Sequence, residues 1–427
     1  MKWFVKGSFV FALSLISVIP AFAGTEIKFD AQVRVRSQAD DKNFDTAYSM
    51  NDYSELRTRV GMNATVEENT HVYIQLQDSR VFGENNQFGK PSSGTLNDSK
   101  NVDLHQGYIK IDKIFGKGWG GQAGRFEFIK GNQRFFGNVG WSNVGRSWDG
   151  SVMWYKNNQF QITGFVLKSL ELKDMTYNRD TDVLGLYAEI NKLNLDLFAV
   201  LEENADTNGY SDRISSLNRY NLGMYYHHQH NQFDFEMNGV YQFGTLPSSD
   251  IYDVDSVDAW EMDIAASMLN FEGVYNFEGN RNAQIAIGAD YSSGNDFKDS
   301  TKYNAYTNAY YTGHKFRGYM DYFISSHPAG LIDLLFRVKM DPAPGWTLNG
   351  DFHYFTTAKE YPIIEESITR ESNDVGMEFD FTISTTKVAG VSLAGGVSIF
   401  LPEEDWAGIT DPDPGVWAYT MATVDIK

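Results

Sequence analysis

Alternation of apolar and polar residues is the feature that most constrains this chain. From Glu26 to the C-terminus, long segments place an apolar residue at every second position, and residues 56–67, 232–243 and 374–383 are clear examples. A period of two puts the two classes of side chain on opposite faces of an extended strand. The pattern therefore predicts an all-β fold in which most strands have one apolar face and one wet face.

The connections between these segments alternate between tight and long. Tight connections fall near residues 67–70, 157–158, 191–192, 228–231, 278–282, 341–345 and 385–390. Long polar connections cover residues 83–101, 131–148, 170–181, 203–217, 245–258, 294–329, 358–373 and 402–414. Counting the segments predicts about 18 strands, with 16 to 18 as the range and an even number expected, and it places both termini on the side of the tight turns.

A soluble β-sandwich would also show this alternation of apolar and polar residues. The presence or absence of exposed sheet edges therefore distinguishes a sandwich from a closed barrel. Two open sheets of about nine strands each would leave long edges unprotected, whereas closure removes every edge. Short turns at one rim and long loops at the other are typical of bacterial outer-membrane barrels, and aromatic residues near strand ends, such as Trp119, Trp154, Tyr155, Trp260 and Trp346, fit their interfacial girdles. We predict a closed antiparallel transmembrane β-barrel over residues 24–427, with short periplasmic turns and long extracellular loops.

The first 23 residues have the features of a secretory signal peptide. Lys2 and Lys6 precede an apolar run over residues 9–19, and the segment ends in the small-residue pattern Ala21-Phe22-Ala23. The apolar run is too short to cross about 30 Å of hydrocarbon as a helix. We therefore expect cleavage near Ala23 and a location in the outer membrane of a Gram-negative-type bacterium.

Composition and motifs exclude several classes of function. The formal charge of −20 opposes binding to nucleic acid, and the absence of cysteine excludes zinc ribbons, iron–sulfur sites and thiol catalysis. No P-loop, dinucleotide fingerprint or nucleophile elbow occurs, so no cofactor is expected. His227, His228 and His230, and the acidic residues near 250–258 and 411–413, are interpreted as solvated connections rather than metal sites.

Several motifs resemble the alginate export family of outer-membrane porin-like barrels. The most specific block runs from Gly124-Arg125-Phe126-Glu127 to Gly145-Arg146-Ser147-Trp148-Asp149-Gly150, and weaker matches cover 57–61, 75–80, 102–108, 131–134, 291–296, 311–321, 353–355 and 376–380. The resemblance implies an 18-stranded monomeric barrel that passes solutes through a constricted lumen lined by arginine and acidic side chains. One departure is the C-terminus, Val424 to Lys427, which lacks the aromatic residue that the barrel-insertion machinery reads in this class.

The wet faces predict which side chains line the pore. Basic groups concentrate in the early strands and acids in the later ones, which suggests arginines on one wall, carboxylates on the opposite wall and a transverse field between them. The long connection after the fifth strand is expected to fold inward with Arg134, Arg146 and Asp149. The predicted lining residues are Arg34, Arg36, Arg57, Arg59, Arg125, Glu127, Arg134, Arg146, Asp149, Asp333, Arg337, Asp351, His353, Glu378 and Asp380.

The charge balance favours some cargoes over others. A polyanion requires a continuous basic track, so the acid excess favours small neutral or zwitterionic solutes over a polyuronate, although an alginate-like exporter and other saccharides remain alternatives. Outer-membrane lipid and lipopolysaccharide are the other expected partners. Two rival functions are an outer-membrane β-barrel hydrolase that uses His105, His314 or His353 with a nearby Ser or Asp, and a soluble secreted glycan-binding β protein. We expect a channel and not an enzyme.

Overall fold

The structure is a computed structural model that describes residues 26–45, 50–82, 102–170, 177–208, 216–251, 260–279, 281–365 and 368–426. The predicted signal peptide, residues 1–23, lies outside the described residues. None of the helices in the described part of the chain is long and apolar enough to cross a membrane.

The described chain is almost entirely β-structure. Its strands are β1 (Glu26–Asp41), β2 (Asn51–Glu67), β3 (Thr70–Val81), β4 (Asp103–Asp112), β5 (Trp119–Phe126), β6 (Trp148–Lys156), β7 (Phe160–Leu170), β8 (Tyr177–Ile190), β9 (Leu195–Asn208), β10 (Ser216–His230), β11 (Phe233–Pro247), β12 (Glu261–Asn276), β13 (Gln284–Ser292), β14 (Lys302–Tyr303), β15 (Leu331–Met340), β16 (Trp346–Glu365), β17 (Ile368–Val388), β18 (Val391–Pro402) and β19 (Gly415–Ile426). The short helices are η2 (Asn191–Leu193), η3 (Ser248–Asp250), η4 (Gly313–Lys315) and α2 (Glu404–Ala407).

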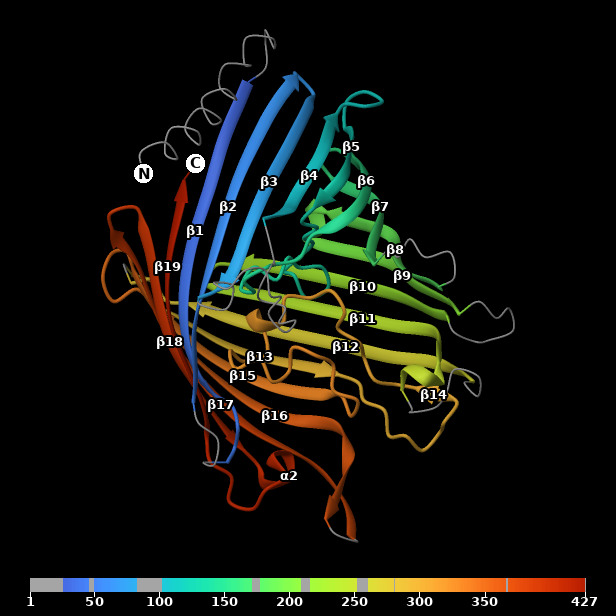
Figure 1. The fold of residues 1–427 in the computed structure, drawn as a ribbon, viewed down its shortest axis with the longest axis vertical. Helices are drawn as coiled ribbons and strands as arrows, with labels where there is room; N and C mark the ends of the chain where they lie inside the picture. The colour runs from blue at the N-terminus through green and yellow to red at the C-terminus, as the bar shows by residue number, and fades with distance from the viewer. Residues whose placement is uncertain are drawn as a thin grey trace, which may run out of the picture.

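The strands close into one barrel (Figure 1). Each wall strand pairs antiparallel with its neighbours in chain order, and β1 pairs with both β2 and β19, so that Val35 lies opposite Leu56 on one side and Ala422 on the other. The two-residue strand β14 pairs parallel with β12 and is not part of the wall, because β13 pairs directly with β15. Among the described residues the wall therefore has 18 strands, which confirms the closed barrel and rules out the sandwich.

The outer face of the barrel is apolar. Val60, Leu222, Leu269 and Ile287 are each at least half exposed, and they belong to a large set of exposed aliphatic and aromatic side chains on the strands. A soluble protein rarely exposes so much apolar surface. A barrel in hydrocarbon needs it, because closure satisfies the backbone hydrogen bonds and the outward side chains contact lipid.

The two rims differ as the sequence predicted. Short connections join β2 to β3, β6 to β7, β8 to β9, β10 to β11, β15 to β16 and β17 to β18, and the start of β1 and the end of β19 lie at this same rim (Figure 1). One predicted long loop, 358–373, is instead mostly strand, because β16 and β17 continue past an irregular register, with Tyr361 opposite Ser372. In this segment Ile363 and Ile364 are consecutive and most other residues are polar, so the period of two was not visible and the sequence did not identify it as strand.

Two long connections fold into the barrel. We call residues 127–147, between β5 and β6, loop A, and residues 293–330, between β13 and β15, loop B; both cross the enclosed space in Figure 1. Phe136 of loop A and Met320 of loop B are fully buried, and Tyr306 of loop B is 2% exposed. They pack on inward side chains such as Phe165 and Leu331. The inner face is therefore apolar in several places where the sequence predicts a wet pore lining.

Closure through β19 gives the first prediction. Truncation before Gly415 removes β19 and leaves the edges of β1 and β18 unpaired in hydrocarbon, where each unsatisfied peptide group costs several kcal/mol. We expect complete loss of the heat-modifiable band that folded barrels give on detergent gels. A chain that lacks only Lys427 serves as the control and should retain this band, and a heat-modifiable band from the truncated chain would contradict the closure.

Candidate functional site

Loops A and B contact each other inside the barrel. The backbone N–H of Gly137 donates to the carbonyl of Tyr310 at 2.9 Å, and Thr312 donates from its backbone to the Gln133 carbonyl at 3.1 Å and from its hydroxyl to the Gln133 side-chain oxygen at 2.9 Å. A Cβ added at Gly137 would lie 2.0 Å from the Thr312 hydroxyl oxygen, so only glycine allows this approach. The two loops thus form a single partition across the lumen.

Part of the partition is sealed by apolar packing. The rings of Phe136 and Tyr310 are stacked with centroids 5.9 Å apart, and Trp148 meets the Tyr310 ring edge-on at 5.0 Å. Inward residues of β5 to β12 complete this cluster. Because this side of the lumen is filled, a route for solutes has to lie toward β1, β2 and the last strands.

Arginines of β1 and β2 hold loop A from the wall. The guanidinium groups of Arg34 and Arg57 both donate to the carbonyls of Gly140, at 2.9 and 3.1 Å, and Ser142, at 3.0 Å each. Arg36 donates to the Trp141 carbonyl at 2.8 Å. These side chains are buried. Their hydrogen bonds therefore fix the path of loop A.

Two carboxylates accompany these arginines. Glu55 accepts hydrogen bonds from Arg36 Nε at 3.0 Å and from the Gln38 amide at 2.9 Å. Glu127 accepts from Arg59 at 3.2 Å. Four guanidinium groups, those of Arg34, Arg36, Arg57 and Arg59, thus face two carboxylates, and this sector of the wall carries a net positive charge.

Asp290 of β13 joins both loops to the wall. Arg134 of loop A and Arg317 of loop B both form ion pairs with its carboxylate, and Arg317 also donates to the Ser292 hydroxyl at 2.6 Å. Burial alone would lower the pKa of the Arg317 guanidinium, but the Asp290 carboxylate outweighs it and raises this pKa above its ordinary value. The predicted inward fold of Arg134 thus coincides with a buried ion pair.

The acidic side chains of β15 to β17 form a second charged sector. Both carboxylate oxygens of Asp333 lie 2.9 Å from His353 Nδ1, and Arg337 Nε lies 3.0 Å from each oxygen of Asp351. Arg337 also reaches Glu272 of β12 at 3.1 Å. All these side chains point inward.

Loop B contacts Glu378, one of the next two carboxylates of this sector. The backbone N–H of Met320 donates to Glu378 at 2.8 Å, and Ser398 of β18 donates to Asp380. Gly318 has a φ of +75°, and a Cβ there would lie 2.5 Å from Glu378 Oε2. Glycine is therefore required where loop B crosses β17.

The basic and acidic sectors do not face each other across the barrel. β17, β16 and β15 are three, four and five strands from β1, by way of β18 and β19, because the barrel closes between its first and last strands; the opposite wall of an 18-stranded barrel is nine strands away. The prediction that Asp333, Asp351, Glu378 and Asp380 stand on the wall opposite the arginines is therefore wrong. Separation along the chain does not measure separation around a closed cylinder.

Arg125 and Asp149 are not pore-lining residues. They lie opposite each other on β5 and β6, form an ion pair and are 35% and 59% exposed. Their neighbours Phe126 and Trp148, which alternate with them, point inward and are 2% exposed. Because the loops fill this part of the lumen with apolar groups, the rule that apolar faces point outward is inverted here.

An aromatic column links the basic sector to both loops. The guanidinium of Arg36 lies 4.1 Å from the centroid of the Trp141 ring, Trp141 stacks on His314 at 4.1 Å and 11°, and His314 stacks on Tyr319 at 5.0 Å. His314 Nδ1 also lies 2.9 Å from Asp321. Trp141 and Tyr319 were not among the predicted site residues, because pore side chains were expected to be charged. Their place in long connections rich in Gly and aromatic residues was the available signal.

A cavity of about 980 Å³ lies beside this column. It is bordered by Arg36 and Trp417 on the wall, by Trp141 and Arg146 of loop A, and by Asp321 among the residues of loop B. Arg146 donates to the carbonyls of Gly137 and Tyr311, at 3.5 and 3.4 Å, and burial lowers the pKa of its guanidinium. Burial likewise lowers the pKa of Lys315, whose ammonium donates to the Asn132 carbonyl at 3.1 Å. The cavity thus borders both loops.

His105 connects the two ends of loop A. Its Nε2 lies 2.8 Å from Glu127 and its Nδ1 lies 3.2 Å from the Ser147 hydroxyl. This serine–histidine–carboxylate chain is the arrangement that the hydrolase alternative requires. However, none of the three residues borders the 980 Å³ cavity, and Glu127 also binds Arg59 and Asn138. We interpret His105 as an anchor for loop A.

The histidines of the β10–β11 turn have hydrogen-bond partners. His227 Nε2 lies 2.7 Å from Asp234, and His228 Nδ1 lies 3.2 Å from Asn194. Within the described ranges, no three His, Cys, Asp or Glu side chains are arranged to hold a metal ion. Part of the acidic segment 250–258 lies outside the described residues.

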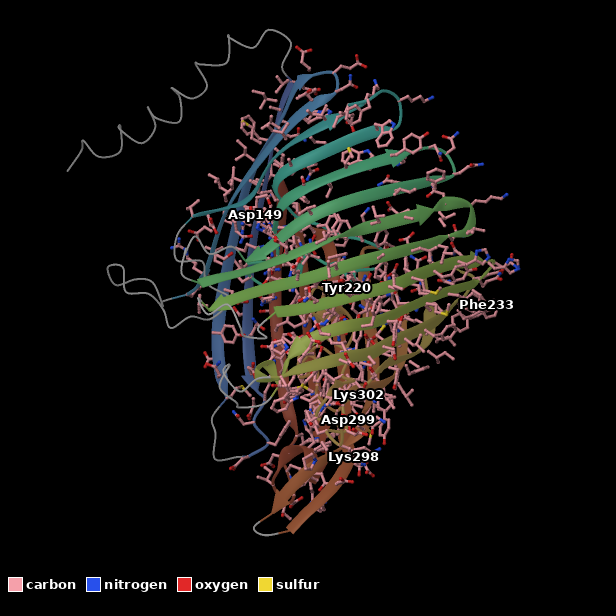
Figure 2. The ribbon with its side chains drawn as sticks, turned by 90° about the vertical axis from the view of Figure 1, so that its right-hand side faces the viewer. Asp149, Tyr220, Phe233, Lys298, Asp299 and Lys302 are labelled. Atoms are coloured by element: carbon pink, nitrogen blue, oxygen red, sulfur yellow. The ribbon has the colours of Figure 1, made fainter. Side chains whose placement is uncertain are left out.

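The Asp290 junction gives the second prediction. Asp290→Asn leaves the Arg134 and Arg317 guanidinium groups buried without their carboxylate, and breaking a buried pair in this way costs about 3–5 kcal/mol. We expect a lower free energy of unfolding of that order in denaturant titrations of the refolded barrel. The matched control is Asp299→Asn, in the exposed Asp299–Lys302 pair of loop B labelled in Figure 2, which should leave the free energy of unfolding unchanged. Equal effects of the two variants would contradict the assignment.

The amino-acid sequence matches a known protein family. The sequence model described as "Alginate export" matches residues 25–404. No curated protein sequence matches the chain.

The fold is similar to solved structures of outer-membrane porins. OccAB1 of Acinetobacter baumannii is 13% identical, with a TM-score of 0.61 and coverage of 95% of this chain and 98% of that one. OccK8 (OprE) of Pseudomonas aeruginosa is 11% identical, with a TM-score of 0.58 and coverage of 94% and 98%. A BenF-like porin from Pseudomonas fluorescens Pf-5 is 8% identical, with a TM-score of 0.58 and coverage of 95% and 100%. The chain therefore belongs to the alginate export family and has the fold of an outer-membrane porin channel.

Proposed function

We propose that this channel passes small neutral or zwitterionic polar solutes past the partition formed by loops A and B. The observation that carries the proposal is the 980 Å³ cavity, which lies between both loops and the β1–β19 wall. Trp141 and Trp417 border it together with Gln38, Asn308 and Ser326, so that aromatic rings and neutral hydrogen-bonding groups meet at one place. Such a mixed lining suits a polar solute of modest size.

The charges around the cavity are nearly balanced. Arg36 and Lys42 border it, but each pairs with a carboxylate, of Glu55 and Asp40 respectively. Arg146 and Asp321 add one charge of each sign. A zwitterion can orient in such a field without meeting a net charge of either sign.

A polyuronate exporter is less well supported by this geometry. A polyanion needs a continuous basic track, whereas Arg34, Arg36 and Arg57 are only 3–5% exposed and are occupied by loop A carbonyls or Glu55. Exposing them to a polymer would require loop A to leave the lumen.

The family and the fold are those of an outer-membrane channel, and they support a transporter over an enzyme. The proposal has three further parts. The signal peptide is cleaved near Ala23, the barrel-assembly machinery inserts the chain although it lacks a C-terminal aromatic residue, and the barrel is a monomer. Single-channel recordings with purified protein in planar bilayers test it, and protein that inserts without conducting would refute it.

The wall arginines give a further prediction. Arg57→Ala removes hydrogen bonds from a charged donor to Gly140, Ser142 and Gln32, each worth about 1.5–3 kcal/mol. Loop A should loosen, so we expect a higher or more fluctuating single-channel conductance. Arg125→Ala changes an outward side chain of the same charge and should leave conductance unchanged. The opposite ranking of the two variants would show that the anchors of loop A do not control the pore.

Arg146 gives a prediction about selectivity. Arg146 borders the cavity, and its guanidinium donates hydrogen bonds to the backbone carbonyls of Gly137 and Tyr311. Arg146→Gln keeps a hydrogen-bonding side chain and removes the charge, so the ratio of anion to cation permeability should fall. Reversal potentials in a salt gradient measure this ratio, and Lys298→Gln, on an exposed part of loop B, is the control. An unchanged ratio would place the solute route away from the cavity.

A further inference from the structure

A cavity of about 740 Å³ lies at the turn rim, between the ends of two neighbouring hairpins. Residues of the β4–β5 turn (113–118) and of the β6–β7 turn (157–159) border it. The β4–β5 turn lies at the same rim as the start of β1 (Figure 1). The backbone N–H of Lys156 donates to the Gly118 carbonyl at 2.8 Å, so the two hairpins are joined at this place. We call it the rim cavity.

Aromatic side chains from both faces of the wall border the rim cavity. By the alternation that places Phe126 in the lumen, Trp119 and Tyr155 face outward, and their ring centroids are 5.1 Å apart. Trp154, the next residue to Tyr155, faces inward and covers Gly120. The cavity therefore opens at the ends of the strands and not on one face of the wall. Aromatic rings at this level of an outer-membrane barrel lie among lipid headgroups.

The tip of the β4–β5 turn exposes apolar side chains. Phe115 is 71% exposed and Ile114 is 40% exposed. Ile114 Cδ1 lies 3.0 Å from the place that a Cβ on Gly121 would take, and Gly121 faces outward, two residues after Trp119. The ring of Phe115 meets that of Trp119 edge-on at 6.1 Å. The tip therefore leans over the outer face of β5, where apolar side chains contact lipid.

The rim cavity carries a positive charge. The charged residues on its border are Asp112, Lys113, Lys117 and Lys156. Lys113 pairs with Glu68 at 3.2 Å, and Asp112 lies 3.6 Å from Lys110. Within the described part of the chain, no carboxylate forms an ion pair with Lys117 or Lys156. Two lysines are therefore left without a neutralising partner, in a chain whose formal charge is −20.

We propose that the rim cavity binds the headgroup of an anionic phospholipid from the periplasmic leaflet. Lys117 and Lys156 pair with the phosphate, as ammonium groups do in other phosphate sites. The side-chain amides of Asn157 and Asn158 are further donors on the same border. Phe115 lies against the acyl chains, at the level of the outward aromatic rings.

Charge complementarity selects this occupant. A zwitterionic phospholipid carries an ammonium group that the two lysines repel, whereas an anionic phospholipid does not. A second copy of the chain in the same membrane stands parallel to the first and meets its outer face, so it does not reach a cavity that opens at the strand ends. The proposal rests on the outer-membrane location and on short turns that face the periplasm, and not on the solute that the channel passes.

Native mass spectrometry of the detergent-purified barrel tests the lipid site. The probes are a phosphatidylglycerol and a phosphatidylethanolamine with the same acyl chains. The unmodified protein should retain the first at least about tenfold better, because each lysine attracts an anionic headgroup, and the double variant Lys117→Gln with Lys156→Gln should lose this preference. The matched double variant Lys298→Gln with Lys302→Gln, which removes two lysines of loop B labelled in Figure 2, should keep it.

Three outcomes of this experiment would overturn the proposal. They are equal retention of both lipids by the unmodified protein, an unchanged preference in the Lys117 and Lys156 variant, and displacement of the phosphatidylglycerol by an equal concentration of inorganic phosphate. The last outcome would make the cavity a phosphate site and not a lipid site.

The level of the turn in the membrane is tested independently. The chain has no cysteine, so single nitroxide labels can be attached after Phe115→Cys or Lys302→Cys. In vesicles, the label at 115 should be less accessible to a water-soluble nickel reagent than the label at 302, and equal access would contradict the lipid contact of the turn. Heat-modifiable migration and single-channel conductance of every variant report folding and channel function separately, so failure of the lipid site is distinguishable from failure of the channel.

Discussion

The structure depends on one constraint: a strand surrounded by hydrocarbon must find partners for all its backbone N–H and C=O groups. β1 meets this requirement by pairing with β2 on one side and β19 on the other, so the wall has no free edge. Closure then divides the side chains between lipid and an enclosed space. Everything inside must be solvated, packed or paired with an opposite charge, and loops A and B provide most of that packing and pairing.

The way the loops are held explains why the charged residues are buried. A cylinder of 18 strands is wide enough for an aqueous channel, and loops A and B narrow it. Backbone carbonyls of loop A neutralise part of the field of Arg34 and Arg57, and Asp290 accepts one arginine from each loop. The same charges therefore shape the solute route and fix the partition that bounds it.

The sequence predicted the strands of the barrel wall better than the positions of the loops and side chains inside the barrel. Period-two alternation and the two kinds of connection are local signals, and they were sufficient for the closed barrel, the strand number and the shared rim of the termini. The position of a side chain inside the barrel depends on contacts between distant segments, such as Trp141 with His314 or Arg134 with Asp290. Those contacts have no signature in either segment alone. Arg125 and Asp149 were assigned to the pore for the same reason, since nothing local shows that Phe126 and Trp148 face an apolar cluster.

On β5 to β8 the apolar side chains face the lumen and the charged side chains face outward, so the packing of the lumen determines what this part of the outer face carries. The inner side of these strands carries Phe126, Leu167 and Val183, which pack in one cluster with loops A and B. The charged residues that alternate with them must therefore point outward. The ion pairs Arg125–Asp149 and Lys168–Asp182 on the outer face are thus a geometric consequence of plugging the lumen with apolar side chains, because a strand with a period of two cannot bury one set without exposing the other. A barrel of this family that kept an open lumen at β5 to β8 would have no reason to carry ion pairs on its outer face. The apolar packing inside and the ion pairs outside therefore arise from the same choice of side chains on four strands.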